Sequence, residues 1–278
     1  MPPVTLSLAK GDGGTRAFKQ GTTVVPSTSS ETTGEARRSF DKLRMTDSIS
    51  TKLRTTSVHC VAISDTHNRA ERIAVPDGDL LLHAGDLTMQ GTEAELVRAA
   101  HWLGTMQHRF RAIIAIPGNH DFGIAANPEA NRELFRANGV MLLIDEAAVV
   151  EGLNFYGSPW QPWFYDWAYN FPQDDDGAFA RKTWAAIPSD TDVLMTHGPP
   201  HGILDATFGG ADTRVGCPYL LAAVQDLAPR LQVHLFGHIH EAYGQLRKGG
   251  TLFVNASTCD RERYAPVQPP IEFDLHLP

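Results

Sequence analysis

The chain has 278 residues, 42% of them hydrophobic, and a formal net charge of −8 at pH 7, which permits one large domain or two small ones with a sizeable core. No stretch approaches the roughly 20 apolar residues of a membrane span, and no apolar block near the N-terminus is long enough for a secretory signal. Because the negative charge also argues against a general nucleic-acid surface, we expect a cytoplasmic protein with no membrane partner and no stable nucleic-acid partner.

Residues 1–56 differ in composition from the rest of the chain. Eighteen of them are Ser or Thr, apolar periodicity is absent, and their net charge of +4 leaves −12 for the remainder. Such a segment buries too little apolar surface to offset the entropy lost on ordering, so we predict that it is disordered. We interpret it as a dispensable tail or as the result of a start codon assigned too early, with Met45 as an alternative start; a targeting peptide is the other reading. The domain is then expected over residues 57–278.

From Val58 onward the sequence contains a series of predicted strands. Each is a short apolar run, often rich in β-branched residues, that ends at polar or glycine-containing positions. These runs lie at 58–64, 79–85, 111–118, 140–144, 153–158, 191–198 and 231–238.

Predicted helices separate several of these strands. They lie at 92–108, 128–138 and 218–228. Thr92 and Glu95 form a capping box at the start of the first helix. Pro128 opens the second and Gly139 follows it, an asymmetry typical of helix ends. Strands that alternate with helices indicate an α/β domain.

Five of the predicted strands end in compact polar clusters. In chain order these are Asp65-Thr66-His67, Gly85-Asp86, Gly118-Asn119-His120-Asp121, Thr196-His197-Gly198 and Gly237-His238-Ile239-His240. Ligands of α/β sheets bind in the crevice outside the carboxyl ends of the strands, so we expect the clusters to converge there. Any one cluster alone is compatible with an ordinary loop, but all five in this order argue against that reading. The neighbouring glycines would let the backbone come close to the site.

The side chains of these clusters are nitrogen and oxygen donors, a set that suits Mn, Fe, Zn or Ni. Residues two apart in an extended segment face the same side, so Asp65 can share an ion with His67, and His238 and His240 can approach one centre. Seven protein donors are too many for one ion and fit two divalent metal ions joined by a bridging carboxylate. Two ions about 3.5–4 Å apart form a clamp suited to phosphoryl chemistry.

In this order the clusters resemble the motifs of the calcineurin-like metallophosphoesterase family. The resemblance extends over about 57–278, because it includes strings between and after the clusters, such as GSPWQPWFYDWAYNFP, DVLMTHGPPHGILD and NASTCDRERYAPVQPPIEFDL. They are similar to the subgroup that includes the vertebrate brain metallophosphoesterase-domain proteins and their bacterial relatives. The resemblance implies a four-layer α/β/β/α sandwich with the metals at one edge of the paired sheets.

The resemblance also implies a role for each residue of the clusters. The ligands of the first ion would be Asp65, His67 and His240, those of the second Asn119, His197 and His238, with Asp86 as the bridge. His120 would be the catalytic histidine that contacts the phosphate and protonates the leaving oxygen, and Asp121 would orient it. Manganese is the favoured metal.

The implied activity is hydrolysis of a small phosphoester or nucleotide, in which a metal-activated hydroxide attacks phosphorus. The subgroup favours a phosphodiesterase acting on 2′,3′- or 3′,5′-cyclic nucleotides. The alternatives are a phosphomonoesterase or protein phosphatase and, from another class, a non-catalytic metal-binding scaffold.

Other ring-bearing residues are expected to serve mainly structural roles. We expect His83 and His234 to be structural, and His201 is a candidate substrate contact because its loop follows His197. An aromatic run is expected to pack mostly in the core, with one or two rings lining the cleft and able to stack on a base. Its members are Trp160, Trp163, Phe164, Tyr165, Trp167, Tyr169 and Phe171.

Overall fold

The computed structural model describes residues 57–173, 175–208 and 213–277. The prediction of disorder for 1–56 lies outside these ranges. None of the helices within them combines the length and the apolar character that a membrane span needs.

The first sheet has the strand order β11-β1-β2-β3-β4. Its bounds are β1 (Ser57–Ile63), β2 (Leu80–His83), β3 (Ala112–Ala115), β4 (Met141–Leu142) and β11 (Ile271–His276). Strands β1 to β4 are parallel, so their carboxyl ends reach the same edge, and β11 pairs antiparallel with β1. The predicted strand 140–144 is shorter in the structure, because β4 pairs with β3 over two residue pairs only.

The second sheet has the order β5-β6-β7-β8-β10-β9. Its bounds are β5 (Glu146–Val150), β6 (Leu153–Ser158), β7 (Val193–Thr196), β8 (Val233–Phe236), β9 (Gly244–Lys248) and β10 (Thr251–Asn255). The four central strands are parallel, and β5 and β9 close the two edges as antiparallel partners. The central parallel strands thus direct the loops after β7 and β8 to one edge.

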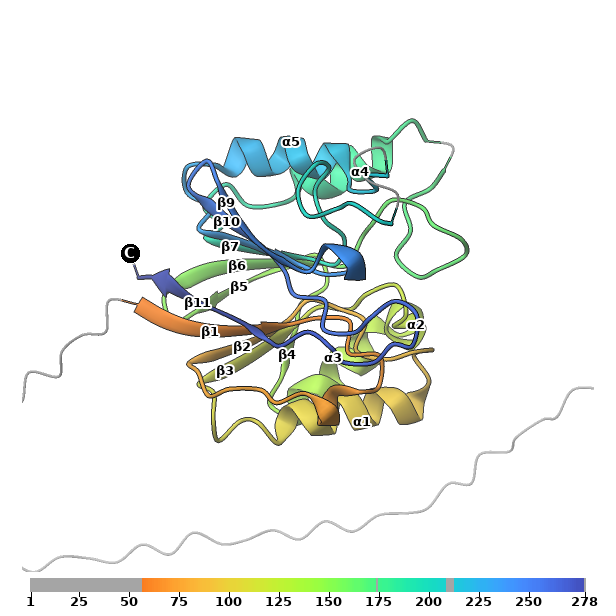
Figure 1. The fold of residues 1–278 in the computed structure, drawn as a ribbon, viewed down its shortest axis with the longest axis vertical. Helices are drawn as coiled ribbons and strands as arrows, with labels where there is room; N and C mark the ends of the chain where they lie inside the picture. Colours follow the sequence, from red (N-terminus) through yellow and green to blue (C-terminus); the bar gives the residue numbers. More distant parts are fainter. Residues whose placement is uncertain (1–56, 174, 209–212, 278) are drawn as a thin grey trace, which may run out of the picture. The chain divides into compact units, whose positions relative to one another are not determined.

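Helices cover the outer face of each sheet. On the first sheet lie α1 (Glu93–Gly104), α2 (Phe122–Ala126) and α3 (Pro128–Ala137), and on the second lie α4 (Ala178–Ala185) and α5 (Pro218–Leu227), with short helices η1 (Ala70–Arg72) and η2 (His240–Ala242) in loops. The predicted capping box is present, because Thr92 accepts a hydrogen bond from the Glu95 backbone and the Glu95 carboxylate accepts one in return. The layers in Figure 1 therefore follow the order helix, sheet, sheet, helix, which confirms the predicted α/β/β/α sandwich.

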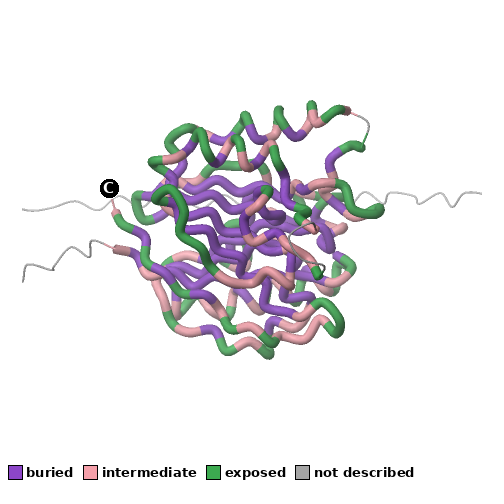
Figure 2. The backbone as a smooth tube through the Cα atoms, turned by 45° about the horizontal axis from the view of Figure 1, so that its top comes forward, coloured by how far each residue is buried: buried purple, intermediate pink, exposed green. Residues whose placement is uncertain are grey.

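The alternation of side chains along β1 shows why the two sheets pack in this way. Val58, Cys60 and Ala62 belong to a buried cluster shared with the second sheet. Val61 and Ile63 point the other way and join a second cluster with α1 and α3. A strand buried on both faces is typical of a parallel sheet covered by helices. In Figure 2 the buried backbone accordingly runs through the middle layers, while exposed stretches lie at the periphery.

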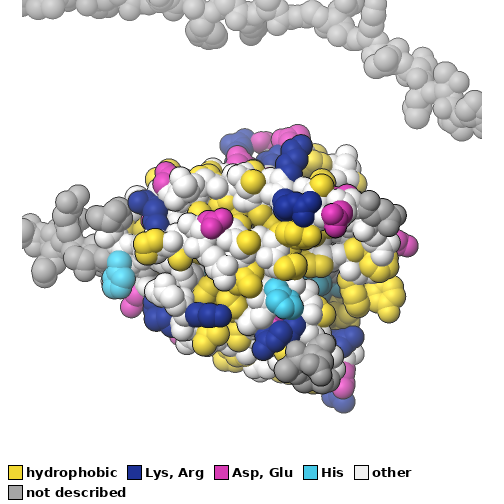
Figure 3. All heavy atoms as spheres, turned by 90° about the horizontal axis from the view of Figure 1, so that it is seen from above, with side chains coloured by type: hydrophobic (Ala, Val, Ile, Leu, Met, Phe, Trp, Pro, Cys, Tyr) yellow, Lys and Arg dark blue, Asp and Glu magenta, His cyan; other side chains and the backbone are white. Residues whose placement is uncertain are grey.

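The outer face above α4 and α5 is mixed in charge. In Figure 3, Lys and Arg side chains are interspersed with Asp and Glu side chains rather than gathered into one basic stripe.

His234 of β8 is a structural core residue, as the sequence predicts. It is completely buried, its Nε2 lies 2.8 Å from Thr196 Oγ1, and its ring contacts Phe236 and Phe253. Burial lowers the pKa of His234 to about 3. In the unfolded chain the pKa is about 6.5, so below that pH the unfolded state binds a proton that the folded state does not.

We therefore expect the free energy of unfolding of the metal-free protein to fall as the pH decreases below about 6.5, until the folded state is itself protonated near pH 3. His234 alone contributes up to about 1.4 kcal/mol per pH unit to this slope. A His234→Leu variant should have a shallower slope between pH 6.5 and 5, whatever its stability at neutral pH. Urea unfolding at three pH values measures both slopes, and equal slopes would contradict the prediction.

Candidate metal centre and cleft

The five polar clusters lie at one edge of the paired sheets. The first three follow β1, β2 and β3 of one sheet, and the other two follow β7 and β8 of the other. Because these strands are parallel within each sheet, their following loops meet at the same edge. The structure brings the predicted ligands from all five loops within reach of one another.

Asp65, His67 and His240 form the first group. One ligand atom from each lies within 4.8 Å of the others. The His240 Nε2 is 3.2 Å from Asp65 Oδ1 and 3.3 Å from the His67 Nε2. The Asp65 carboxylate also accepts hydrogen bonds from the His238 backbone N–H and from the Ser257 hydroxyl, at 2.9 Å in the latter case. Ser257 was not distinguished by the sequence, although it lies in one of the strings that carry the family resemblance.

Asp86 lies between the two groups of ligands. Its Oδ2 is 3.7 Å from the His67 Nε2 on one side and 3.4 Å from the His197 Nε2 on the other. Its Oδ1 accepts a hydrogen bond of 2.8 Å from the His120 backbone N–H, which fixes the carboxylate in this orientation. One oxygen of Asp86 can therefore face both halves of the site.

The second group contains His197, Asn119 and His238. The His197 Nδ1 is 2.9 Å from the Ala84 carbonyl oxygen, an acceptor, so Nδ1 carries the proton. In the neutral ring the Nε2 lone pair then faces Asn119 Oδ1 at 2.9 Å. The ring of His238 lies edge-on to the ring of His197 with centroids 5.0 Å apart.

The donor set fits divalent cations. Burial lowers the pKa values of His67 and His238 to about 3, so both imidazoles are neutral and able to bind metal. Burial alone would lower the pKa of His197, but Asp86 and Asp65 raise it to about 9. The carboxylates thus favour positive charge at this position, and the nitrogen and oxygen donors of both ligand groups converge on it. A cation between these atoms would satisfy both conditions.

The backbone around the ligands adopts strained conformations. Asp65, His67, Asp86 and His238 have positive φ angles of 54°, 41°, 55° and 68°. Such angles are uncommon outside glycine and cluster at functional sites, where the surrounding structure imposes them. The neighbouring Gly237 leaves no room for a Cβ, which would collide with the Asp65 carboxylate and the Ser64 hydroxyl. The expectation that glycine allows close backbone approach therefore holds at this position.

The sequence predicts that Asp121 orients the His120 ring, and the structure corrects this. Among the described residues, the Asp121 carboxylate accepts hydrogen bonds from the backbone N–H groups of Gly118, Leu87 and Thr88 and from the Thr88 hydroxyl. The His120 Nδ1 instead lies 2.8 Å from the Met89 carbonyl oxygen. Asp121 therefore ties the loop after β2 to the loop after β3 and affects His120 only through the backbone.

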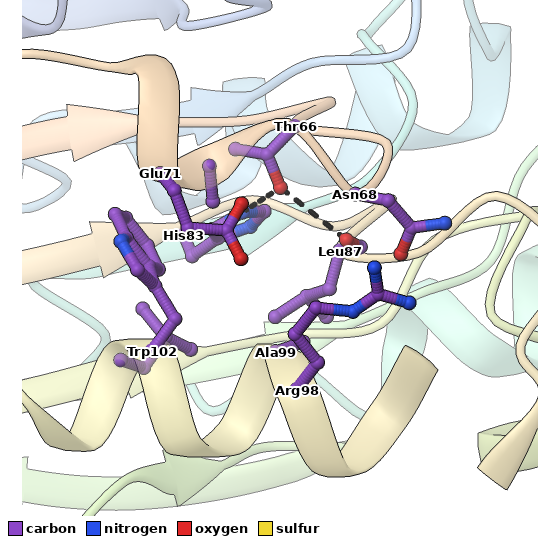
Figure 4. A pocket seen from close by; sticks show the side chains of 10 residues that line it. Thr66, Asn68, Glu71, His83, Leu87, Arg98, Ala99 and Trp102 are labelled. Atoms are coloured by element: carbon purple, nitrogen blue, oxygen red, sulfur yellow. Dashed lines mark hydrogen bonds between the residues drawn. The ribbon is translucent and has the colours of Figure 1, made fainter. Parts of the chain in front are cut away.

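His83 supports the loop after β1, which carries Asp65 and His67, in agreement with its predicted structural role. Its Nδ1 accepts a hydrogen bond from the Gly85 backbone, so its Nε2 donates to Thr66 Oγ1 at 3.1 Å. Burial lowers the pKa of His83 to about 4, which keeps the ring neutral. Figure 4 shows His83 pointing toward Thr66, with Trp102 of α1 beside it. Thr66 lies between Asp65 and His67, so this contact holds both candidate ligands in place.

A cleft of about 310 Å³ opens beside the candidate metal ligands. Asp86, Asn119, His120, His238 and His240 contribute to its floor. Part of its wall is aromatic and comes from Trp163, Phe164, Trp167 and Tyr264. The other members of the predicted aromatic run divide between core and surface: Phe171 is buried in the core, whereas Tyr165 is exposed. Exposed His201, a candidate substrate contact, is not among the described residues that line this cleft.

The chain resembles known proteins in sequence and in fold. The calcineurin-like phosphoesterase pattern matches residues 58–242. The chain is 39% identical over 242 residues to human metallophosphoesterase domain-containing protein 1. The aligned region covers 78% of this chain and 71% of that protein. It is 26% identical over 191 residues to a 3′,5′-cyclic-nucleotide phosphodiesterase of Nostoc sp., covering 66% and 64% of the two chains. A solved structure from Thermus thermophilus has a TM-score of 0.52 at 15% identity, over 73% of this chain and 90% of that one, which indicates a shared fold.

Proposed function

The chain belongs to the calcineurin-like phosphoesterase family, as its five polar clusters predict, and from this premise we propose that it hydrolyses phosphodiesters with the help of two divalent metal ions. The observation that carries the proposal is the position of Asp86. Its Oδ2 faces one imidazole of each ligand group, at 3.7 Å and 3.4 Å. A carboxylate placed in this way is suited to hold two ions close together.

Asp65, His67 and His240 would hold one ion, and Asn119, His197 and His238 the other. When bound, the ions supply Lewis-acid stabilisation of a phosphoryl group and lower the pKa of water, the two roles that paired metals perform in phosphoester hydrolysis. We propose manganese as the metal; the mixed imidazole, amide and carboxylate ligands admit it alongside Fe, Zn or Ni.

His120 is placed to assist the leaving group. Its Nδ1 lies 2.8 Å from the Met89 carbonyl oxygen, which fixes the proton on that nitrogen. Its ring lines the cleft and packs on Trp167 with centroids 4.1 Å apart, so the ring is held in one orientation. The Nε2 is then the atom that can hold a proton for the leaving oxygen of the substrate.

The cleft favours a substrate with one phosphate and a flat apolar group. Arg261 is the one Lys or Arg among the described residues that line it, and Arg261 is already paired with Glu241 at 3.0 Å. A polyphosphate would require further cations, whereas the rings of Trp163 and Phe164 offer surfaces on which a base can stack. A cyclic nucleotide meets both conditions, and the Nostoc relative is named for activity on 3′,5′-cyclic nucleotides.

We predict that chelator-stripped protein is inactive and that Mn²⁺ restores hydrolysis of bis-p-nitrophenyl phosphate more than of p-nitrophenyl phosphate. The reason is that the site presents its charges to one phosphoryl group and offers apolar surface to the second ester group. Release of p-nitrophenolate with and without Mn²⁺ measures both reactions. Faster turnover of the monoester would indicate a phosphatase instead. Metal binding without turnover of either ester or of cyclic nucleotides would support a binding role.

A further inference from the structure

Tyr264 lies over the candidate metal centre, although it is far from the five polar clusters in the sequence. Its ring contacts the ring of His67 edge-on, with centroids 4.6 Å apart and planes at 72°. It also lies 5.9 Å from the rings of His120 and His240. Tyr264 therefore borders a ligand of the first group, the proposed proton donor and the open cleft at the same time.

A turn fixed by backbone hydrogen bonds holds Tyr264 in this position. The Asp260 N–H donates to the Ala265 carbonyl oxygen at 2.8 Å, and Cys259 pairs with Pro266 as an antiparallel bridge. The turn is attached to the first sheet, because the Thr258 N–H donates to the Ser64 carbonyl oxygen at 2.9 Å, next to Asp65. The segment that carries Tyr264 is thus tied to the strand end that carries the first ligands.

The backbone of Tyr264 has a φ of 49°. For a bulky residue this is a genuine outlier, which costs about 1–3 kcal/mol and persists only where the surrounding structure imposes it. The strain places the ring over the imidazoles rather than toward solvent. The hydroxyl has no hydrogen-bond partner among residues 57–173, 175–208 and 213–277, so its donor is available to a molecule in the cleft.

We propose that Tyr264 is a substrate-contacting residue whose hydroxyl donates a hydrogen bond to the phosphoryl group at the metal centre. This inference rests on the proposed phosphoesterase function. The hydrogen bond adds a neutral donor to a site where the metals supply the positive charge, and such donors stabilise the oxygens on which charge develops. The ring itself has a separate effect, because it packs on His67 and limits the movement of that ligand.

The variants Tyr264→Phe and Tyr264→Ala separate these two effects. Phe keeps the ring and removes only the hydroxyl. We expect Tyr264→Phe to bind the same amount of Mn²⁺ as the wild type and to lower kcat for bis-p-nitrophenyl phosphate about 100-fold, the lower end of the range for loss of one oxyanion donor. Tyr264→Ala should in addition bind Mn²⁺ less tightly. The matched control is Tyr219→Phe, which removes a hydroxyl that bonds to the Asp176 carbonyl on the α4–α5 side and should leave kcat unchanged.

Binding of inorganic phosphate to the Mn²⁺-loaded protein, measured by calorimetry, gives a readout that does not require turnover. Tyr264→Phe should weaken phosphate binding about 2- to 10-fold, the equivalent of one neutral hydrogen bond. If Tyr264→Phe matches the wild type in phosphate affinity and kcat while Tyr264→Ala is impaired, the residue is only a packing group and the inference is overturned. A wild type that binds phosphate but hydrolyses no ester would remove the proposed function. The two phosphate affinities would still decide the role of Tyr264.

Discussion

Replacement of Asp86 by Asn is expected to abolish tight binding of both metal ions and to lower phosphodiester hydrolysis more than about 1,000-fold, beyond the upper end of the cost of losing one oxyanion donor. The substitution preserves the size of the side chain, so its effect comes from charge. Asp86 Oδ2 faces the His67 and His197 imidazoles. An amide in this position keeps one oxygen and directs an N–H₂ donor or a neutral oxygen toward the place where the cations would lie.

The fold tolerates this change better than the metal centre does. Asn keeps an acceptor for the His120 backbone N–H, which Asp86 Oδ1 receives at 2.8 Å. We therefore expect the metal-free variant still to unfold in one transition, at lower stability than the metal-free wild type because the buried contact between Asp86 and His197 loses its charge. The loss should appear in metal content, measured by mass spectrometry after gel filtration, and in the absence of stabilisation by added Mn²⁺.

A matched control is Asp77→Asn. The Asp77 carboxylate is 82% exposed and pairs with Arg109 on the surface, and such exposed pairs contribute little to stability. This variant should bind two ions and hydrolyse the diester at the wild-type rate. An Asp86→Asn protein that still binds two ions per chain and turns over the diester would show that Asp86 is not the shared ligand.

Local signals in the sequence were sufficient for the elements that surround the site. The run 153–158 coincides with β6, and the capping box at Thr92 marks the start of α1. Both depend on interactions between residues close in the chain. The pairing of β11 with β1 joins segments more than 200 residues apart, and no local pattern specifies such a partner. Even so, the buried and exposed residues of β11 alternate strictly, a signal that could have predicted the strand itself.

The candidate ligands could be predicted because they follow strands directly, whereas their supporting contacts could not. Adjacency in the sequence suggests that Asp121 contacts the His120 ring, but the two side chains bind different backbone groups of the loop after β2, the Thr88 N–H and the Met89 carbonyl oxygen. The true partner of His120 Nδ1 is a carbonyl oxygen, of Met89, and a backbone group carries no sequence signal. Tyr264 depends on a positive φ and a turn geometry that its own residue type disfavours.

Replacement of His120 by Ala is expected to lower kcat about 100- to 10,000-fold, the usual contribution of general acid–base catalysis, while both metal ions remain bound. The metal ions should remain because His120 is not one of the proposed ligands. Its ring is held by the Met89 carbonyl oxygen and by packing on Trp167. A second variant, His120→Asn, can keep a donor for the Met89 carbonyl but lacks the free ring nitrogen. It should be as inactive as His120→Ala if proton transfer is the function of the ring.

The choice of leaving group makes this prediction specific. p-Nitrophenolate leaves readily without a proton, whereas the ribose oxygen of a cyclic nucleotide needs one. The loss in both His120 variants should therefore be larger for 2′,3′-cyclic AMP than for bis-p-nitrophenyl phosphate, with exposed His101→Ala on α1 as the control. Equal losses on both substrates would mean that His120 acts on the phosphoryl oxygens instead. A variant that loses metal together with activity would show that His120 is a metal ligand. This alternative should be tested first, because a ring nitrogen of His120 lies within 4.8 Å of ligand atoms of His67 and Asp86.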